Sequence, residues 1–174
     1  PPCEGDVNGD GRLDIVQRMY WYEQPENPDS GNWKKHGWSP MASAGGAQIL
    51  VHDFDADGDN DIVSSLKAHG YGLAWFEQLE PGKFARHDLM GENSTDNPYG
   101  VCFSQLHALT LSDIDGDGRM DFVTGKRYLA HQGKDPGGLM DPVLYWFRNV
   151  KTEDGIDFVP HFVHDDSGVG VEIT

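Results

Sequence analysis

The sequence predicts an all-β fold made of β-propeller blades. Three observations predict it: an acidic loop motif that recurs three times, an aromatic strand pattern after each copy, and a composition rich in turn residues. With 22 glycines and 10 prolines in 174 residues, the chain favours many turns and short strands over long helices. Four short strands in each repeat of about 50 residues is the pattern of propeller blades.

The acidic motif reads D-x-[DN]-[GA]-D-G-x-x-D-[IF]-V and aligns without a gap in its three copies, which begin at Asp6, Asp53 and Asp113. These copies hold twelve of the 29 acidic residues, and the chain has only 13 Lys+Arg to balance them. Carboxylates at this density repel one another unless a cation neutralises them. The motif therefore predicts a cation loop, and the alternative is a set of solvated Asp-Gly turns.

Calcium is the cation that the spacing favours. Oxygen ligands at positions 1, 3, 5 and 9, with a backbone carbonyl at position 7, suit hard Ca²⁺, and the glycine at position 6 allows the sharp turn. Mg²⁺ prefers fewer protein ligands and more water. About three Ca²⁺ ions are expected, with Arg12, Asp59 and Arg119 binding through the backbone carbonyl. The predicted ligands are Asp6, Asn8, Asp10, Arg12, Asp14, Asp53, Asp55, Asp57, Asp59, Asp61, Asp113, Asp115, Asp117, Arg119 and Asp121.

Two further segments follow each loop, which makes the unit a four-stranded blade. The first is an aromatic strand, found at Tyr20–Gln24, Ala74–Gln78 and Tyr145–Asn149. The second is an aromatic-x-x-His segment that ends at His36, His87 and His161. Because these three histidines recur at one place in the unit, we expect them to be structural, with ring nitrogens bonded to backbone.

The units divide the chain into about three blades, at residues 1–40, 41–100 and 101–166, with 167–174 as the first strand of a further blade or a closing strand. Only five residues precede the first loop, which is too few for a leading strand. Propellers typically need four to eight blades. We therefore expect either a segment of a longer chain or self-association that completes the propeller.

The D-x-D-x-D-G-x-x-D-I-V loops resemble FG-GAP/VCBS repeats, as in integrin-type β-propellers, over nearly the whole chain. Four segments, Gly72–Gln78, Phe103–His107, Thr124–Arg127 and His164–Gly170, are similar to large secreted bacterial VCBS-repeat proteins and to the propeller domain of aldos-2-ulose dehydratases. The resemblance implies a propeller fold and an extracellular, periplasmic or cell-surface location.

A second group of residues is not explained by the repeat. His69, His107 and His131 do not recur. Repeat equivalence places His69 and His131 at one mouth of the propeller with Lys67, Lys126 and Arg127, and His107 lies on a lead-in strand, which in a propeller is usually innermost. One interpretation is a sugar-processing site, in which histidine acts as a base and the cations stabilise an enolate-like charge. Another is a transition-metal site formed by the three histidines. The third is a set of ordinary polar loop residues.

Charge and hydropathy limit the partners. A formal charge of −16 argues against nucleic acid, and no apolar run is long enough for a membrane span. We expect a calcium-binding, extracytoplasmic module that binds a carbohydrate or protein ligand. The alternative is part of a sugar-active dehydratase or lyase, a carbon-oxygen lyase that acts on ketosugars or polysaccharides. Cys3 and Cys102 are compatible with a disulfide or with two free thiols.

Overall fold

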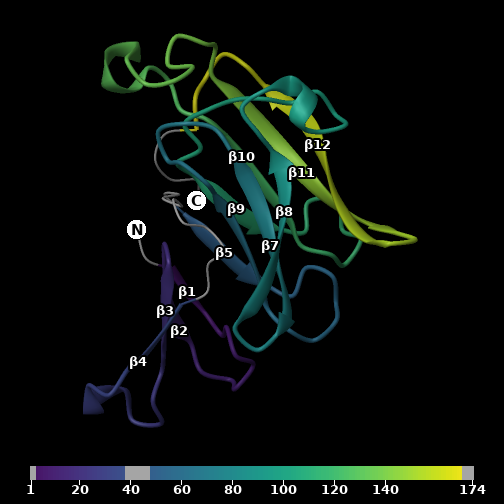
Figure 1. Cartoon of the computed structure of the whole chain (residues 1–174). Coiled ribbons are helices and arrows are strands. Elements are labelled where there is room, and N and C mark those ends of the chain that lie inside the picture. Colours follow the sequence, from purple (N-terminus) through teal and green to yellow (C-terminus); the bar gives the residue numbers. More distant parts are fainter. Residues whose placement is uncertain (1–2, 38–47, 170–174) are drawn as a thin grey trace.

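The structure is a computed structural model that describes residues 3–37 and 48–169, and it confirms the all-β prediction (Figure 1). Twelve strands form three four-stranded antiparallel sheets, and in each sheet neighbouring strands follow sequence order. Each sheet is a propeller blade. The strands are β1 (Cys3–Gly5), β2 (Asp14–Gln17), β3 (Tyr20–Glu23), β4 (Lys34–Gly37), β5 (Ile49–His52), β6 (Asp61–Ser65), β7 (Leu73–Glu80), β8 (Lys83–Met90), β9 (Leu109–Ser112), β10 (Asp121–Lys126), β11 (Val143–Thr152) and β12 (Gly155–His164).

Three 3-10 helices lie in connections, and the acidic motif takes the same place in every blade. The helices are η1 (Pro28–Ser30), η2 (Ser94–Asp96) and η3 (Ala130–Gly133). Each motif joins the first and second strands, and its ninth residue starts the second strand, as Asp61 does in β6. The aromatic segments form the third strands and the His-bearing segments form the fourth, as the sequence predicts.

The first strands of the three blades lie next to one another. β1 contacts β5, and β5 contacts β9, so the blades form a row with the middle blade between the other two (Figure 1). A glycine allows the first of these contacts. A Cβ atom at Gly5 would lie 2.4 Å from the Cβ of Val51, which no other residue tolerates without a shift of the strands.

The middle blade buries both of its faces because it lies between two neighbours. On β7, Ala74 and Phe76 pack in the core shared with the first blade, whereas Leu73 and Trp75 pack in the core shared with the third. Successive side chains of a strand point to opposite faces of its sheet. This alternation explains why the middle strands are apolar at nearly every position.

The two outer blades each have one uncovered face in the described part of the chain. Ile62 of the middle blade is fully buried, but its equivalent in the first blade, Ile15, is 38% exposed. At motif position 2, Phe54 is 2% exposed, whereas its equivalent in the third blade, Ile114, is 43% exposed. The surfaces that join consecutive blades are therefore open at both outer blades.

An amide at the end of each aromatic strand ties a blade to the one before it. Gln78 Nε2 donates to the carbonyl of Val7 in the first blade at 2.9 Å, and Asn149 Nδ2 donates to the carbonyl of Phe54 in the second at 2.8 Å. In the first blade the equivalent residue, Gln24, donates to a carbonyl of its own loop at 2.8 Å. The contacts between blades thus repeat as regularly as the strands do.

One expectation about the first blade is wrong. Five residues before the first loop were expected to be too few for a leading strand, but β1 forms there and pairs with β2, with Cys3 opposite Val16. The innermost strand needs only three residues in this blade. The closing strand expected at 167–174 and the blade boundary near residue 40 fall largely outside the described residues.

Candidate functional site

The acidic loops gather carboxylates, as the motif predicts. In the second and third copies, one oxygen from each carboxylate at positions 1, 3 and 5 lies within 4.8 Å of the others: Asp53, Asp55 and Asp57, then Asp113, Asp115 and Asp117. In the first copy, Asn8 supplies an amide oxygen at position 3 between Asp6 and Asp10. Each loop therefore presents a set of hard oxygen atoms.

Backbone hydrogen bonds wrap each loop around these oxygens. In the second copy, the N–H of Asp57 donates to Asp53 Oδ1 and Asp55 Oδ1, both at 3.2 Å, and the N–H of Gly58 donates to Asp53 Oδ2 at 3.1 Å. Gly58 has φ 103°, a value that favours glycine. The corresponding bonds recur in the first and third copies. The sequence repeat is thus a repeat of geometry.

The aspartate at position 9 holds each loop onto its sheet. Asp61 is 1% exposed; its Oδ1 accepts from the N–H of Gln78 at 2.8 Å, and its Oδ2 accepts from Trp75 Nε1 at 3.0 Å and from the N–H of Phe54 at 3.3 Å. Burial raises the pKa of Asp61 to about 7 despite these donors. A cation nearby would stabilise the ionised form of this carboxylate. The role of Asp61 as a Ca²⁺ ligand stays a prediction.

Arginines partly neutralise the first and third loops. In the first, the guanidinium of Arg12 forms an ion pair with Asp10. In the third, Arg148 Nε lies 2.6 Å from Asp115 Oδ2. These cations reduce the repulsion between the carboxylates and compete with a metal ion for the same oxygens.

The second loop has no such arginine. Asp59 stands at the position of Arg12, and Glu77 stands at the position of Arg148. Burial, and then the charge of Asp57, raise the pKa of Asp55, and Glu77 adds to that rise. Of the three loops, the second therefore carries the most negative charge, and a bound cation would relieve the most repulsion there.

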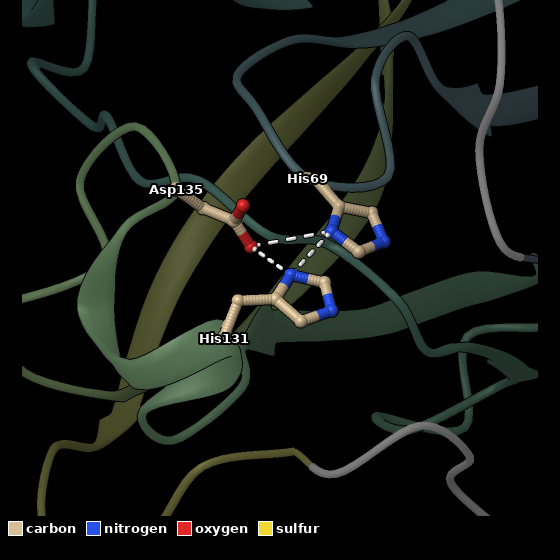
Figure 2. Close-up of side chains that lie close together, drawn as sticks. All are labelled: His69, His131 and Asp135. Carbon is tan, nitrogen blue, oxygen red and sulfur yellow. Dashed lines mark hydrogen bonds and ion pairs between the residues drawn. The ribbon is translucent and has the colours of Figure 1, made fainter.

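A separate cluster forms between the second and third blades. His69 lies on the connection between β6 and β7, His131 lies in η3, and Asp135 follows in the next turn (Figure 2). The two Nδ1 atoms are 3.1 Å apart, and they lie 3.2 Å and 2.8 Å from Asp135 Oδ2. Burial alone would raise the pKa of Asp135, but the hydrogen bonds from His131 and His69 lower it below its usual range.

Arg127 and His107 lie beside this cluster. Arg127 Nη2 is 3.5 Å from His69 Nδ1 and 3.7 Å from Asp135 Oδ2. The rings of His69 and His107 meet edge to face with centroids 4.9 Å apart. Burial, and then Arg127 and the other two histidines, lower the pKa of His107 to about 4. The structure therefore brings together His69, His107, His131 and Arg127, with His107 neutral at physiological pH.

Lys126, which the sequence grouped with these residues, is placed differently. Its side chain is fully buried, and its Nζ donates to the carbonyl of Arg127 at 3.3 Å. Burial lowers the pKa of its ammonium group. Among the described contacts none joins Lys126 to His69 or Asp135, so it contacts the backbone of Arg127 just after β10 and does not line the cluster.

Backbone strain accompanies the cluster. Gln105, His131 and Gln132 have φ values of 63°, 47° and 59°, which side-chain-bearing residues rarely adopt. Such conformations cost roughly 1–3 kcal/mol each and gather at functional sites. Gln105 is fully buried, and its carbonyl accepts from the N–H of Arg127 at 3.5 Å. The strained residues thus flank the histidines and the arginine.

Comparison with known proteins bears on the loops. Residues 53–124 match the family model of the FG-GAP-like repeat. The chain contains an FG-GAP-like repeat. No curated protein sequence matches the chain. The repeat includes the second and third acidic loops, His69 and His107, whereas His131 and Asp135 follow it.

The recurring histidines help to build the three blades. Each stacks on the tryptophan of the neighbouring strand. The ring centroids lie 4.2, 4.6 and 4.8 Å apart for His36 on Trp21, His87 on Trp75 and His161 on Trp146. In the first two blades the ring Nε2 lies 2.7 Å from a carboxylate, Glu23 or Glu77, and so the polar partner is an acidic side chain and not the expected backbone group.

Two remaining features concern the cysteines and the helices. Cys3 and Cys102 are both free, and burial raises the pKa of the Cys3 thiol to about 12 and that of Cys102 above its usual value. Neither thiol is therefore poised to react. Within residues 3–37 and 48–169, no helix has the length and apolar character that a membrane crossing requires.

Proposed function

We propose that this chain is a Ca²⁺-binding, extracytoplasmic β-propeller module that contacts protein partners. One observation carries the proposal: the same backbone wrap around the oxygens of positions 1, 3 and 5 recurs in all three loops. Ca²⁺ takes six to eight oxygen ligands in flexible geometry. The loop side chains, the position 7 carbonyl and water can supply them.

The location follows from the same chemistry. Ca²⁺ sites in extracellular modules have dissociation constants of about 0.1–1 mM, which extracellular calcium fills and cytosolic calcium does not. Binding to the folded chain alone adds to folding stability. In this proposal each ion fixes the turn between the first and second strands of its blade, and the rigid blades present the connecting loops to partners.

The second loop is expected to bind Ca²⁺ most tightly because its five carboxylates have no arginine partner. Asp57→Ala should therefore abolish the highest-affinity phase in a calorimetric Ca²⁺ titration. The matched change in the first loop, Asp10→Ala, should leave that phase in place and remove a weaker one. If Asp10→Ala removed the tightest phase, or if both variants titrated like the unchanged chain, the charge argument would be wrong.

The partner that the open faces fit is a second copy of this chain. The uncovered face of the third blade offers Ile114, at the position that Val7 and Phe54 fill in the two inner junctions. The uncovered face of the first blade offers Ile15, at the position that Ile62 fills beside Val7 and Phe122 fills beside Phe54. Two copies joined third blade to first blade at both junctions would close a ring of about six blades, within the usual range. We include this self-association in the proposal.

Sedimentation velocity tests the association. With Ca²⁺ present, a species of twice the 19.3 kDa chain mass is expected to increase with concentration. Ile15→Glu and Ile114→Glu should each return the protein to monomer, because each places a charge in the apolar junction. Leu79→Glu is the control, since Leu79 is 59% exposed outside the described junctions. A monomer at every concentration would contradict the dimer.

A second candidate function is a sugar-active lyase, which the convergence of His69, His131 and Arg127 favours. With a pKa of about 4, His107 is a poor general base near neutral pH, so His69 or His131 would have to take the proton. Absorbance of an unsaturated product from ketosugars or uronates, lost in His69→Ala without loss of folding, would support the lyase. Absence of product from every such substrate would leave the binding module.

A further inference from the structure

We propose that His69, His131 and Asp135 form a transition-metal site of the Zn²⁺ type. It is distinct in chemistry from the Ca²⁺ loops and independent of them. Imidazole nitrogen suits Zn²⁺ and similar ions, whereas Ca²⁺ takes oxygen ligands. The histidines come from connections of adjacent blades, and their ring nitrogens converge on the same carboxylate oxygen (Figure 2). Asp135 thus takes the place that the sequence assigned to His107.

The geometry of the three atoms suits a metal ion. The sides of the triangle formed by His69 Nδ1, His131 Nδ1 and Asp135 Oδ2 are 3.1, 3.2 and 2.8 Å. For such a triangle, a point about 2.1 Å from all three corners exists about 1 Å out of their plane, and zinc bonds to nitrogen and to carboxylate oxygen have about that length. The three distances therefore leave room for an ion at zinc bond lengths from each atom.

Protons and a metal ion are alternative ways to hold these three atoms together. If both Nδ1 atoms carry hydrogen, both donate to Asp135 Oδ2, and the two nitrogens lie 3.1 Å apart. If only one carries hydrogen, a single proton must serve the contact with the other ring and the contact with the carboxylate. A metal ion would take the place of the Nδ1 protons, because both nitrogens and the oxygen then offer lone pairs to it.

The site is open on one side and positively charged. The side chains of His69 and His131 are 45% and 56% exposed, so three protein ligands would leave a position for water or a further ligand, as catalytic zinc sites do. One carboxylate leaves a divalent ion with a net positive charge, and Arg127 adds another beside it. Asp135 also lines a shallow pocket with the loop from Gly133 to Met140. The fourth ligand is expected to be an anion such as a carboxylate or phosphate.

The test is a Co²⁺ titration of the Ca²⁺-saturated full chain, followed by visible absorption, with Zn²⁺ calorimetry in parallel. One Co²⁺ per chain is expected to give the intense bands of a four-coordinate ion. His131→Ala and Asp135→Asn should weaken binding by about 100-fold or more, beyond the upper end of the loss typical of outer-sphere changes. His107→Ala should bind almost unchanged, since His107 is not a ligand.

The control is His87→Gln. His87 lies 2.7 Å from Glu77 and so forms a histidine-carboxylate pair that has no second histidine. It should bind Co²⁺ as the unchanged chain does, and the melting curve in Ca²⁺ should show that each variant is folded. The assignment fails if the unchanged chain binds no Co²⁺ or Zn²⁺ stoichiometrically, or if Asp135→Asn binds normally while His107→Ala does not. Because Ca²⁺ stays in excess, either result leaves the calcium proposal untouched.

Inorganic phosphate probes the open position. It is expected to shift the bands of the bound Co²⁺, and Arg127→Gln should weaken phosphate binding while it leaves Co²⁺ affinity within a few-fold. A Co²⁺ spectrum that phosphate does not change would contradict the anionic ligand.

Discussion

Excess EDTA is expected to lower the melting temperature of the Ca²⁺-loaded protein by about 15–30 °C. Each occupied site adds about 2.7 kcal/mol when free Ca²⁺ is 100 times its dissociation constant, so three sites add about 8 kcal/mol. In a domain of this size, each kcal/mol moves the melting temperature by about 2–4 °C. Circular dichroism near the strand band, recorded during heating with Ca²⁺ or with EDTA, measures the shift.

Readdition of Ca²⁺ provides the control for this experiment. The melting temperature should recover fully with Ca²⁺ and only in small part with equimolar Mg²⁺, which demands octahedral geometry and keeps its water. Superimposable melting curves in Ca²⁺ and EDTA would show that the loops are solvated turns, the alternative that the motif also allows.

The effect of EDTA is also expected to grow with pH. The pKa of Asp61 rises from 3.8 to about 7 in the metal-free fold, so between about pH 4 and pH 7 the folded chain holds a proton that the unfolded chain has released. Stability in EDTA therefore falls as pH rises through this window and levels off above it. With Ca²⁺ bound, the ion stabilises the carboxylate instead, and the gap between the two melting curves should be wider at pH 8 than at pH 5.

Asp121→Ala is expected to destabilise the chain by about 3–5 kcal/mol, even in EDTA. Asp121 is fully buried and accepts from Trp146 Nε1 and the N–H of Asn149, both at 2.9 Å, and from the N–H of Ile114 at 3.1 Å. Removing the carboxylate leaves these three donors without their acceptor. Urea unfolding in EDTA measures this cost without any contribution from calcium.

Asp117→Ala is the matched control, because Asp117 belongs to the same loop but is exposed. In EDTA it should cost less than about 1 kcal/mol, since the loop loses mainly surface interactions. In Ca²⁺ the two variants should both lose stability. Equal costs in EDTA would show that the position 9 aspartate has no structural role beyond metal binding.

The blades were predictable because the motif sets the position of every strand around it. The Asp-Gly loop marks the turn between the first and second strands. The aromatic segment marks the third strand, and the recurring histidine marks the fourth. β1 was missed because three residues are a weak signal, and its pairing with β2 and the close approach that Gly5 allows to Val51 are visible only in the fold. The β-propensity of three residues does not show which strand they pair with.

The histidine cluster was only partly predictable. His69 and His131 were distinguished by a simple signal, since they do not recur when the repeat is aligned. Asp135 was missed because nothing local marks it, and its contact with His69 spans 66 residues. Lys126 was grouped with the cluster because repeat equivalence places it at the same end of the blades as Arg127, but its side chain is buried. The positions of these two side chains depend on how the connections between strands fold over the blades. Aligning the repeats does not specify that folding.

The central claim is that three acidic loops bind three calcium ions. Elemental analysis of the protein, equilibrated with Ca²⁺ and then freed of unbound ion by rapid gel filtration, tests it most directly. About three calcium ions per chain are expected, and about two after Asp57→Ala, in keeping with three oxygen-lined loops. A calcium content near zero in the unchanged chain would contradict the account.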